Sequence, residues 1–200
     1  MDLIYLKKFD PEKATTIEKS IYNRCSTRDF SEKPVKLDTL SKILWSGQGM
    51  VKESGSQRRT TPSAGAIYPL ELFIISKNIT GLENAIYHYL PEEHALEPKE
   101  EGGFTESLAS ACLHQRFIER SAFIIVIAGD FEKTKQKYGA RGERYVFMEA
   151  GHACQNMTLV AANLLLGAVV IGAFSDSEIA KILNLGDWFP IAVMPFGHEK

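Results

Sequence analysis

The sequence is poor in cysteine, and the positions of its few cysteines exclude two classes of protein. Three occur among 200 residues, and Cys25, Cys112 and Cys154 lie outside any Cys-x-x-Cys or Cys/His spacing typical of zinc sites. An odd number of scattered thiols favours a reducing compartment over a disulfide scaffold. We therefore expect neither a metal site nor a disulfide framework.

The chain also lacks an excess of basic residues and a secretion signal. Its formal net charge is −2, so we expect no nucleic-acid partner, because contact with phosphates needs a concentrated basic surface. Residues 157–174 carry no charge and reach the length of a membrane span. Asn163 lies near the middle of this stretch and Gly167 divides it, which favours a buried helix followed by a strand over residues 169–171. We expect a soluble cytoplasmic protein that does not enter membranes.

Several common catalytic motifs are missing. No Gly-x-Gly-x-x-Gly follows a strand pattern, which argues against a Rossmann unit, and no phosphate-binding Gly-x-x-x-x-Gly-Lys-[Ser/Thr] occurs. The five histidines show no His-Glu-x-x-His spacing. The hydrophobic fraction of 44% is nevertheless ordinary for a globular domain and excludes a disordered chain.

No repeat or linker divides the chain, so we expect one domain over residues 1–200. Helical spacing or capping signals predict helices, and runs of β-branched and aromatic residues predict strands. The predicted helices are Pro11–Asn23, a helix through 37–44 that ends at Gly47, Phe104–Gln115, Arg141–Leu166 and Asp176–Leu185. The predicted strands are Leu70–Ser76, Ala85–Leu90, Ser121–Gly129 as the innermost, and Phe189–Phe196 at a sheet edge because of its two prolines. This order indicates an α+β fold.

The long helix Arg141–Leu166 carries more low-polarity surface than one core requires. One face repeats apolar residues at three- and four-residue spacing, and the neighbouring face carries Met148, His152, Gln155 and Leu159. We expect one face to pack on the sheet of its own subunit and the other on a second copy.

Three segments are candidates for a binding site. In the first, Arg24 and Arg28 flank Cys25, Ser26 and Thr27, and guanidinium groups with hydroxyls suit a phosphate; a solvated turn or a phosphorylation site would show the same pattern.

The second segment is the loop Arg59–Pro69, whose small residues 63–66 would let a flat ligand lie against the backbone. The third is the strand 166–174 with Gly167 and Gly172, where backbone could approach a ligand closely. A tight loop and a β-bulge are the alternative interpretations of these two segments.

Taken together and in this order, the segments resemble the nitroreductase family of FMN-dependent oxidoreductases. Within the family the chain is most similar to the branch of thiazole/oxazole-peptide (SagB-type) dehydrogenases. The resemblance covers about residues 21–197, and it rests on the segments Thr60–Pro69, Ile86–Tyr89 with Pro91 and His94–Leu96, Tyr138–Tyr145, and Glu149–His152 with Gln155–Asn156.

The resemblance implies a set of cofactor-binding residues. Arg24, Cys25, Ser26 and Arg28 would hold the FMN phosphate and ribityl chain and reach the polar edge of the flavin. Loop and strand residues would contact the isoalloxazine ring: Pro62, Ser63, Ala64 and Gly65 from the other subunit, and the backbone of Ile171, Gly172 and Ala173 near N5.

The resemblance also implies a fold and an activity. The fold would be a three-layer sandwich with a central, mostly antiparallel sheet flanked by helices, dimerising through long helices. The activity would be ping-pong hydride transfer from NAD(P)H through FMN to a nitroaromatic, quinone or similar acceptor. Two alternatives stay open: an FMN-dependent dehydrogenase that oxidises azoline-type heterocycles or a small metabolite, and a non-catalytic flavin-binding module.

The chain departs from the family pattern at two places. Ala66 stands near the position where many members have Asn, which puts one flavin contact in doubt. The chain also ends at Lys200, where other members continue and supply a basic residue to the phosphate, so that His198 or Lys200 would have to replace it.

Overall fold

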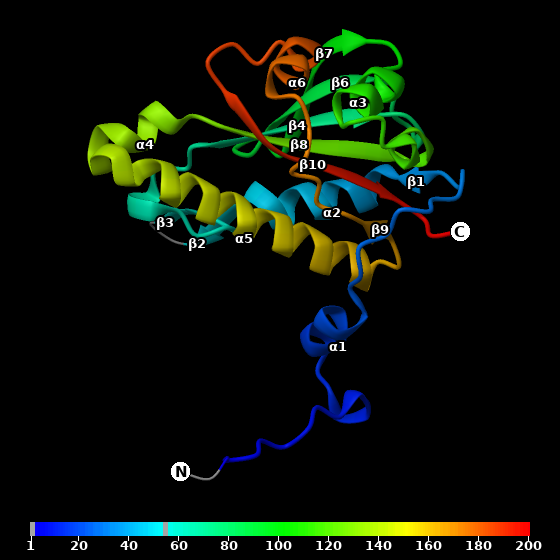
Figure 1. Ribbon diagram of the computed structural model, residues 1–200, viewed down its shortest axis with the longest axis vertical. Coiled ribbons are helices and arrows are strands. Elements are labelled where there is room, and N and C mark those ends of the chain that lie inside the picture. The colour runs from blue at the N-terminus through cyan, green and yellow to red at the C-terminus, as the bar shows by residue number, and fades with distance from the viewer. Residues whose placement is uncertain (1–2, 54–55) are drawn as a thin grey trace.

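The computed structural model describes residues 3–53 and 56–200, and its centre is an antiparallel sheet (Figure 1). Every pair of neighbouring strands runs antiparallel. From one edge to the other, the six strands are β7 (Ala95–Glu101), β6 (Ala85–Leu90), β4 (Leu70–Ser76), β8 (Phe123–Gly129), β10 (Phe189–Gly197) and β9 (Gly167–Ala168).

The strand β8 is central because both of its faces are apolar. All seven of its residues are buried, and it pairs with β4 on one side and β10 on the other. Alternate side chains point to opposite faces, so that Ile125 and Ile127 join one core, and Ile124 and Val126 join a second core. The prediction of an innermost strand at this place is confirmed.

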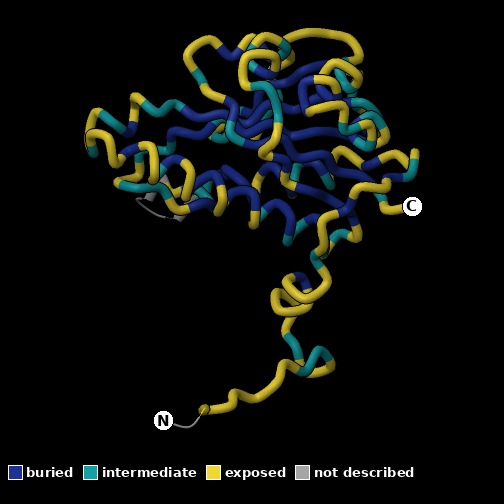
Figure 2. Tube along the Cα trace, viewed as in Figure 1, coloured by how far each residue is buried: buried dark blue, intermediate teal, exposed yellow. Residues whose placement is uncertain are grey.

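Helices cover both faces of the sheet and complete three layers (Figure 1). On one face lie α2 (Leu37–Gln48) and α5 (Gly142–Asn163), with α4 (Phe131–Tyr138) packed on α5. On the other face lie α3 (Thr105–Ala111) and α6 (Asp176–Leu183). The buried residues in Figure 2 follow the sheet and the inward sides of these helices. The predicted α+β sandwich is confirmed.

The remaining elements are short. The strands β1 (Val35–Lys36) and β5 (Ile79–Thr80) pair in parallel, and β2 (Met50–Glu53) and β3 (Ser56–Arg59) form a hairpin. The 3-10 helices are η1 (Pro11–Lys13), η2 (Ala64–Ala66), η3 (Arg116–Arg120) and η4 (Gly139–Arg141). Residues 54–55, between the two strands of this hairpin, lie outside the described range.

The first helix begins later than its sequence pattern predicted. Pro11–Lys13 forms a 3-10 turn, and α1 spans Thr16–Asn23. A capping box explains the new start: the Thr15 hydroxyl accepts a hydrogen bond from the Glu18 amide, and the Glu18 carboxylate accepts one from the Thr15 amide at 2.7 Å. The predicted helix Phe104–Gln115 is also too long, because this segment divides into α3 and a turn before η3.

The predicted edge position of the last strand is wrong. Although it contains Pro190 and Pro195, β10 lies between β8 and β9 in the sheet. Ile171 and Val193 add two further backbone hydrogen bonds, of 2.9 and 3.0 Å. The strand expected at 169–171 is misplaced: β9 covers Gly167–Ala168, and of the predicted residues only Ile171 forms an isolated bridge, with Val193.

The helix α4 was not predicted, because its sequence is dominated by charged and polar residues. Its start does carry a local signal: the Asp130 side chain accepts a hydrogen bond of 3.0 Å from the Lys133 amide. Within the described residues, no helix is both long and apolar enough to cross a membrane.

The close approach of α4 and α5 generates a stability prediction. A Cβ added at Gly142 would lie 2.8 Å from the Lys135 amide nitrogen and 2.9 Å from the Thr134 carbonyl carbon. Because these atoms belong to the backbone, Gly142→Ala should separate the two helices and lower the free energy of unfolding by about 1–3 kcal/mol. Urea denaturation measures the change. Gly103→Ala is the control, since no described atom lies within 4 Å of a Cβ at that position.

Candidate functional site

The segment that follows α1 lies between β9 and the C-terminal residues. Ser26 forms a parallel bridge with Ala168, and the Thr27 amide donates a hydrogen bond of 3.0 Å to the Ala168 carbonyl. Farther along, the Ser31 amide donates to the His198 carbonyl at 2.9 Å. The first and third candidate segments of the sequence therefore lie side by side in one subunit, together with the C-terminal residues.

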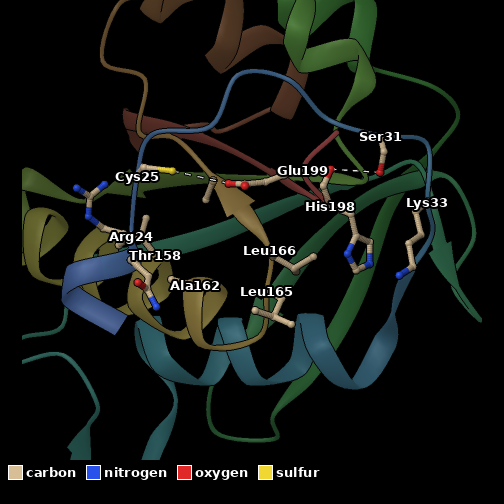
Figure 3. Close-up of a pocket in the computed structure, with 12 residues that line it drawn as sticks. Arg24, Cys25, Ser31, Lys33, Thr158, Ala162, Leu165, Leu166, His198 and Glu199 are labelled. Carbon is tan, nitrogen blue, oxygen red and sulfur yellow. Dashed lines mark hydrogen bonds between the residues drawn. The ribbon is translucent and has the colours of Figure 1, made fainter. Parts of the chain in front are cut away.

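A cavity of about 430 Å³ opens between this segment and the C-terminal end of α5 (Figure 3). Its volume falls in the range of small-molecule sites. We call it the α5 cavity; its walls are formed by Asn23, Arg24, Cys25, Ser31, Lys33, Thr158, Ala162, Leu165, Leu166, Ala168, His198 and Glu199.

The polar wall of the α5 cavity carries more basic than acidic groups. Arg24 and Lys33 contribute two cations, and His198 adds an imidazole whose pKa is lowered below 6.5 by burial and by the nearby Lys33 ammonium. Glu199 is the opposing charge, and its carboxylate accepts a hydrogen bond of 2.5 Å from the Thr27 hydroxyl. A phosphate in this cavity would meet two fixed cations and would favour protonation of His198.

Only some of the residues predicted from the first segment line the α5 cavity. Arg24 and Cys25 line the α5 cavity, whereas Ser26 and Arg28 are exposed and do not line it. Of the two residues proposed as C-terminal substitutes, His198 lines the cavity and Lys200 does not, since the Lys200 amide instead donates to the Asp29 carbonyl. Lys33 was not identified from the sequence, because only the fold of the segment 26–31 brings it to the cavity.

Gly172 and Ala173 are exposed beyond the point where Ile171 pairs with Val193. No described atom lies within 4 Å of a Cβ placed at Gly172, so packing inside the subunit does not require glycine there. The backbone at this point is free to receive a molecule from outside the subunit.

The second candidate segment lies elsewhere, over the middle of α5. The Thr61 hydroxyl donates a hydrogen bond of 2.6 Å to the Gly47 carbonyl, and Asn156 donates one of 3.4 Å to Thr61. Ser63 lies beside Glu149. Pro62 and Gly65 are exposed.

The helix α5 separates the loop from the cavity within one subunit. Ser63 of the loop lies beside Glu149, and the first α5 residue that lines the cavity is Thr158. These two positions on α5 are nine residues apart, which at a rise of 1.5 Å per residue is about 14 Å along the axis. One chain alone therefore does not bring Pro62–Gly65 to the residues predicted to share a site with them.

The loop is held in an unfavourable backbone conformation. Gly65 has φ of 63°, Ala66 of 54° and Tyr68 of 51°, and the last two are residues that rarely adopt positive φ. Side chains compensate, since the Ser63 hydroxyl accepts a hydrogen bond of 2.9 Å from the Tyr68 amide and the Arg59 amide donates one of 3.2 Å to the Tyr68 hydroxyl. Strain of this kind is typical of functional loops.

Two residues of α4 that the sequence reasoning did not select face the loop. A Cβ at Gly65 would lie 2.5 Å from the Lys137 Nζ and 2.7 Å from the Tyr138 hydroxyl. The same ammonium lies 5.5 Å from the centre of the Tyr138 ring. The loop is therefore flanked by an ammonium and a phenol, both of which can donate hydrogen bonds.

Glu149 is a buried carboxyl beneath the same loop. It is 3% exposed, and its Oε1 has no hydrogen-bond partner among the described residues. Burial raises its pKa to about 7, although Ser63, Arg59, Gln48 and Lys133 each act in the opposite direction. Gln48 is itself fully buried and accepts a hydrogen bond of 3.0 Å from Arg59. The sequence showed Glu149 only as part of a family pattern, because its burial depends on the loop.

The two buried cysteines are packing residues, as expected for Cys154. Burial raises the pKa of Cys112 and of Cys154 to about 12, which keeps both thiols protonated at neutral pH. No cluster of three or more His, Cys, Asp or Glu residues suited to a metal ion occurs over residues 3–53 and 56–200.

The raised pKa of Glu149 predicts a pH dependence of stability. Because the folded state holds the proton between pH 4.5 and about 7 while the unfolded state releases it, this carboxyl makes the protein less stable as the pH rises through that range. Relative to Glu149→Gln, the wild-type free energy of unfolding should therefore fall by about 3 kcal/mol. Urea denaturation from pH 4.5 to 8 measures the difference, with Glu143→Gln, an exposed position of α5, as the control. Parallel profiles for wild type and Glu149→Gln would contradict the assignment.

Comparison with known proteins identifies relatives over nearly the whole chain. The family model described as "Nitroreductase family" matches residues 21–198. The nitroreductase-named protein MJ1384 of Methanocaldococcus jannaschii is 39% identical over 183 residues, covering 92% of this chain and 91% of that protein. The microcin B17-processing protein McbC of Escherichia coli is 31% identical over 217 residues, covering 98% of this chain and 79% of McbC.

Solved structures agree with this relationship. A nitroreductase crystal structure from Anabaena variabilis superposes with a TM-score of 0.81 and 28% identity over 92% of this chain, which spans 38% of that longer chain. A chain of the E. coli microcin synthetase McbBCD complex, with truncated pro-MccB17 bound, gives a TM-score of 0.77 and 30% identity, covering 99% of this chain and 76% of that one. The chain belongs to the nitroreductase family.

Proposed function

We propose that this oxidoreductase-family chain is a homodimeric FMN-dependent enzyme that transfers hydride from NAD(P)H to a nitroaromatic, quinone or similar acceptor. The observation that carries the proposal is the α5 cavity, where two separately predicted segments and the C-terminal residues meet around basic side chains.

The residues of the α5 cavity fit the polar end of FMN. Arg24 and Lys33 would hold the phosphate, and His198 would add a third donor once a phosphate raises its lowered pKa. The exposed backbone at Gly172 and Ala173 leaves room for the ring. The side chains of the cavity therefore suit a dianionic phosphate, and the exposed backbone beside it suits a flat ring system.

The second half of the site would come from a second copy. Within one chain the loop Pro62–Gly65, which lies beside Glu149, is separated from the α5 cavity at Thr158 by about 14 Å along α5. The face of α5 that the sequence assigned to a partner is uncovered: Met148 is 52% exposed, and His152 and Gln155 are also exposed. No described atom lies within 4 Å of a Cβ at Gly151, so a second helix could approach closely there. His152 is accordingly an interface residue in this proposal.

When bound, FMN supplies the hydride chemistry, and the protein supplies binding and orientation. Arg24 and Lys33 would anchor the phosphate, and the strained loop of the partner would present a smooth surface to the ring. Glu149 would fix the underside of that loop. Lys137 and Tyr138 would place hydrogen-bond donors beside the same loop.

The similarity to McbC favours a second candidate, an FMN-dependent dehydrogenase that oxidises azoline-type heterocycles. Oxidation of an azoline ring to the aromatic azole removes a hydride, which FMN would accept, and a proton. The proton would pass to water at the exposed surface of the loop, where Pro62 and Gly65 lie.

The absorption spectrum of the purified protein tests the cofactor. We expect a yellow protein with flavin bands, and anaerobic NADPH or NADH should bleach them within one turnover. A flavin that does not bleach, in a protein that oxidises an azoline peptide, would support the dehydrogenase instead. Bound flavin with no turnover of either class would indicate a binding module, and a colourless protein that binds no added FMN would refute the proposal.

Arg24 provides a sharper test of the phosphate contact. Loss of a charge-assisted hydrogen bond in Arg24→Ala should weaken FMN binding by about 1.5–3 kcal/mol, or about 10- to 100-fold in Kd. Quenching of FMN fluorescence during titration measures this Kd. Arg116→Ala removes an exposed guanidinium that does not line the α5 cavity and should leave the Kd unchanged. Equal affinities for wild type and Arg24→Ala would contradict the contact.

A further inference from the structure

The hairpin formed by β6 and β7 takes no part in the proposed FMN site, although Ile86–Tyr89 and His94–Leu96 belong to the segments that resemble the nitroreductase family. It forms the edge of the sheet that lies farthest from β9. A cavity of about 310 Å³ opens between this hairpin and α2. We call it the α2 cavity; five leucines line it together with Ser41, Tyr89 and His94, and none of these residues lines the α5 cavity.

The walls of the α2 cavity are mainly aliphatic. The five leucines come from α2, from the turn after β5 and from β7: Leu37, Leu40, Leu44, Leu82 and Leu96. Leu40 and Leu44 are buried, whereas Leu37 is 39% exposed, so the cavity leads from the surface into the core. Cavities of this size that combine apolar walls with a few polar groups are typical sites for small molecules.

The three polar side chains are joined by hydrogen bonds. The His94 Nδ1 lies 2.7 Å from the Tyr89 hydroxyl, and its Nε2 lies 2.7 Å from the Ser41 hydroxyl. His94 ends the turn between β6 and β7 with φ of 50°, an uncommon conformation for a residue other than glycine. Both ring nitrogens are thus occupied, and the imidazole connects the hairpin to α2.

Burial of Tyr89 decides which of these groups donates. A neutral imidazole carries one N–H, so one hydroxyl donates to His94 and the other accepts from it. Tyr89 is 1% exposed, and burial raises its pKa to about 12, although Arg59 acts in the opposite direction. The phenol therefore keeps its proton, and as an acceptor it would leave that proton buried without a partner, which costs free energy. Tyr89 donates to Nδ1, and the Nε2–H of His94 donates to Ser41.

The Ser41 hydroxyl keeps one hydrogen that is free to donate. Within residues 3–53 and 56–200 this hydroxyl makes no other hydrogen bond than the one to His94. A ligand in the α2 cavity would therefore meet one hydroxyl donor and aliphatic walls. Among the described residues that line the cavity, none is Lys or Arg, and Glu92 and Glu93 precede His94 in the turn. An anionic group would find no fixed cation there.

We propose that the α2 cavity binds a small, neutral, aliphatic molecule that carries a carbonyl oxygen, such as a medium-chain ester or ketone. The aliphatic chain lies among the leucines, where it is removed from water. The carbonyl oxygen accepts a hydrogen bond from the Ser41 hydroxyl. The inference does not rest on the proposed function, because the α2 cavity lies within one subunit and shares no residue with the α5 cavity.

Methyl hexanoate and protein with isotope labels on its leucine methyl groups test the location of the site by NMR. The signals of Leu40 and Leu44 should shift and saturate as the ester is added. Leu108 and Leu183 are buried in the core on the opposite face of the sheet, and their signals should stay unchanged. Leu96→Trp should fill the cavity and abolish the shifts, in a protein that thermal unfolding shows to be folded. Shifts that do not saturate, or that persist in this variant, would overturn the proposal.

Ser41→Ala tests the hydrogen bond and with it the class of ligand. Loss of one neutral hydrogen bond should raise the Kd for methyl hexanoate about 3- to 10-fold in the same titration. Ser110→Ala is the matched control, because Ser110 is an exposed serine of α3 that does not line the α2 cavity. Hexanoate, which has the same chain but a negative charge, should bind more weakly than the ester. Equal Kd values for wild type and Ser41→Ala, or tighter binding of hexanoate, would overturn the proposal.

Discussion

The length and rigidity of α5 are the constraint on which the site depends. The helix is fixed to the sheet by Val146, Ala150, Met157 and Ala161, all buried in one core, so its two ends cannot move toward each other. Strained loop residues lie over its middle, beside Glu149, and a basic cavity lies at its C-terminal end. A flat ligand that needs both surfaces must therefore be bound between two subunits, and the uncovered face of the same helix offers the contact that would bring them together.

Several features of the single subunit are unfavourable in free energy, and the proposed dimer would explain the exposed ones. Met148 and the apolar residues Leu3, Ile4 and Leu6 face water, and Glu149 lies buried with an unpaired oxygen under a loop that contains three positive φ angles. A partner that covers exposed apolar residues removes their free-energy cost, and a strained loop keeps its shape because a buried polar cluster supports it. In the proposed dimer, the exposed apolar residues of one subunit would therefore become favourable contacts.

Local sequence patterns predicted much of the fold but only part of the candidate site. The apolar run of β8 and the two-faced pattern of α5 predicted the central strand and the long helix, since each depends on residues near in sequence. The polar helix α4 was not predicted, because its stability comes from packing on α5. Lys33 and the burial of Glu149 were missed for a similar reason. Lys33 reaches the cavity through contacts between segments more than a hundred residues apart, and Glu149 is buried only once the loop has folded over it. The family resemblance proposed both Arg24 and Arg28 as cofactor-binding residues, and no local signal indicated that only Arg24 would line the α5 cavity.

A site divided between two chains can be tested by complementation. Arg24→Ala damages the α5 cavity, and Gly65→Val damages the loop through its positive φ and the nearby Lys137 and Tyr138. Subunits of the two variants are unfolded together, refolded as mixed dimers and titrated with FMN. If each site uses the cavity of one chain and the loop of the other, half of the dimers are mixed and each contains one intact site, so about a quarter of the sites should regain wild-type affinity. Affinity no higher than in the separate variants would contradict the shared site.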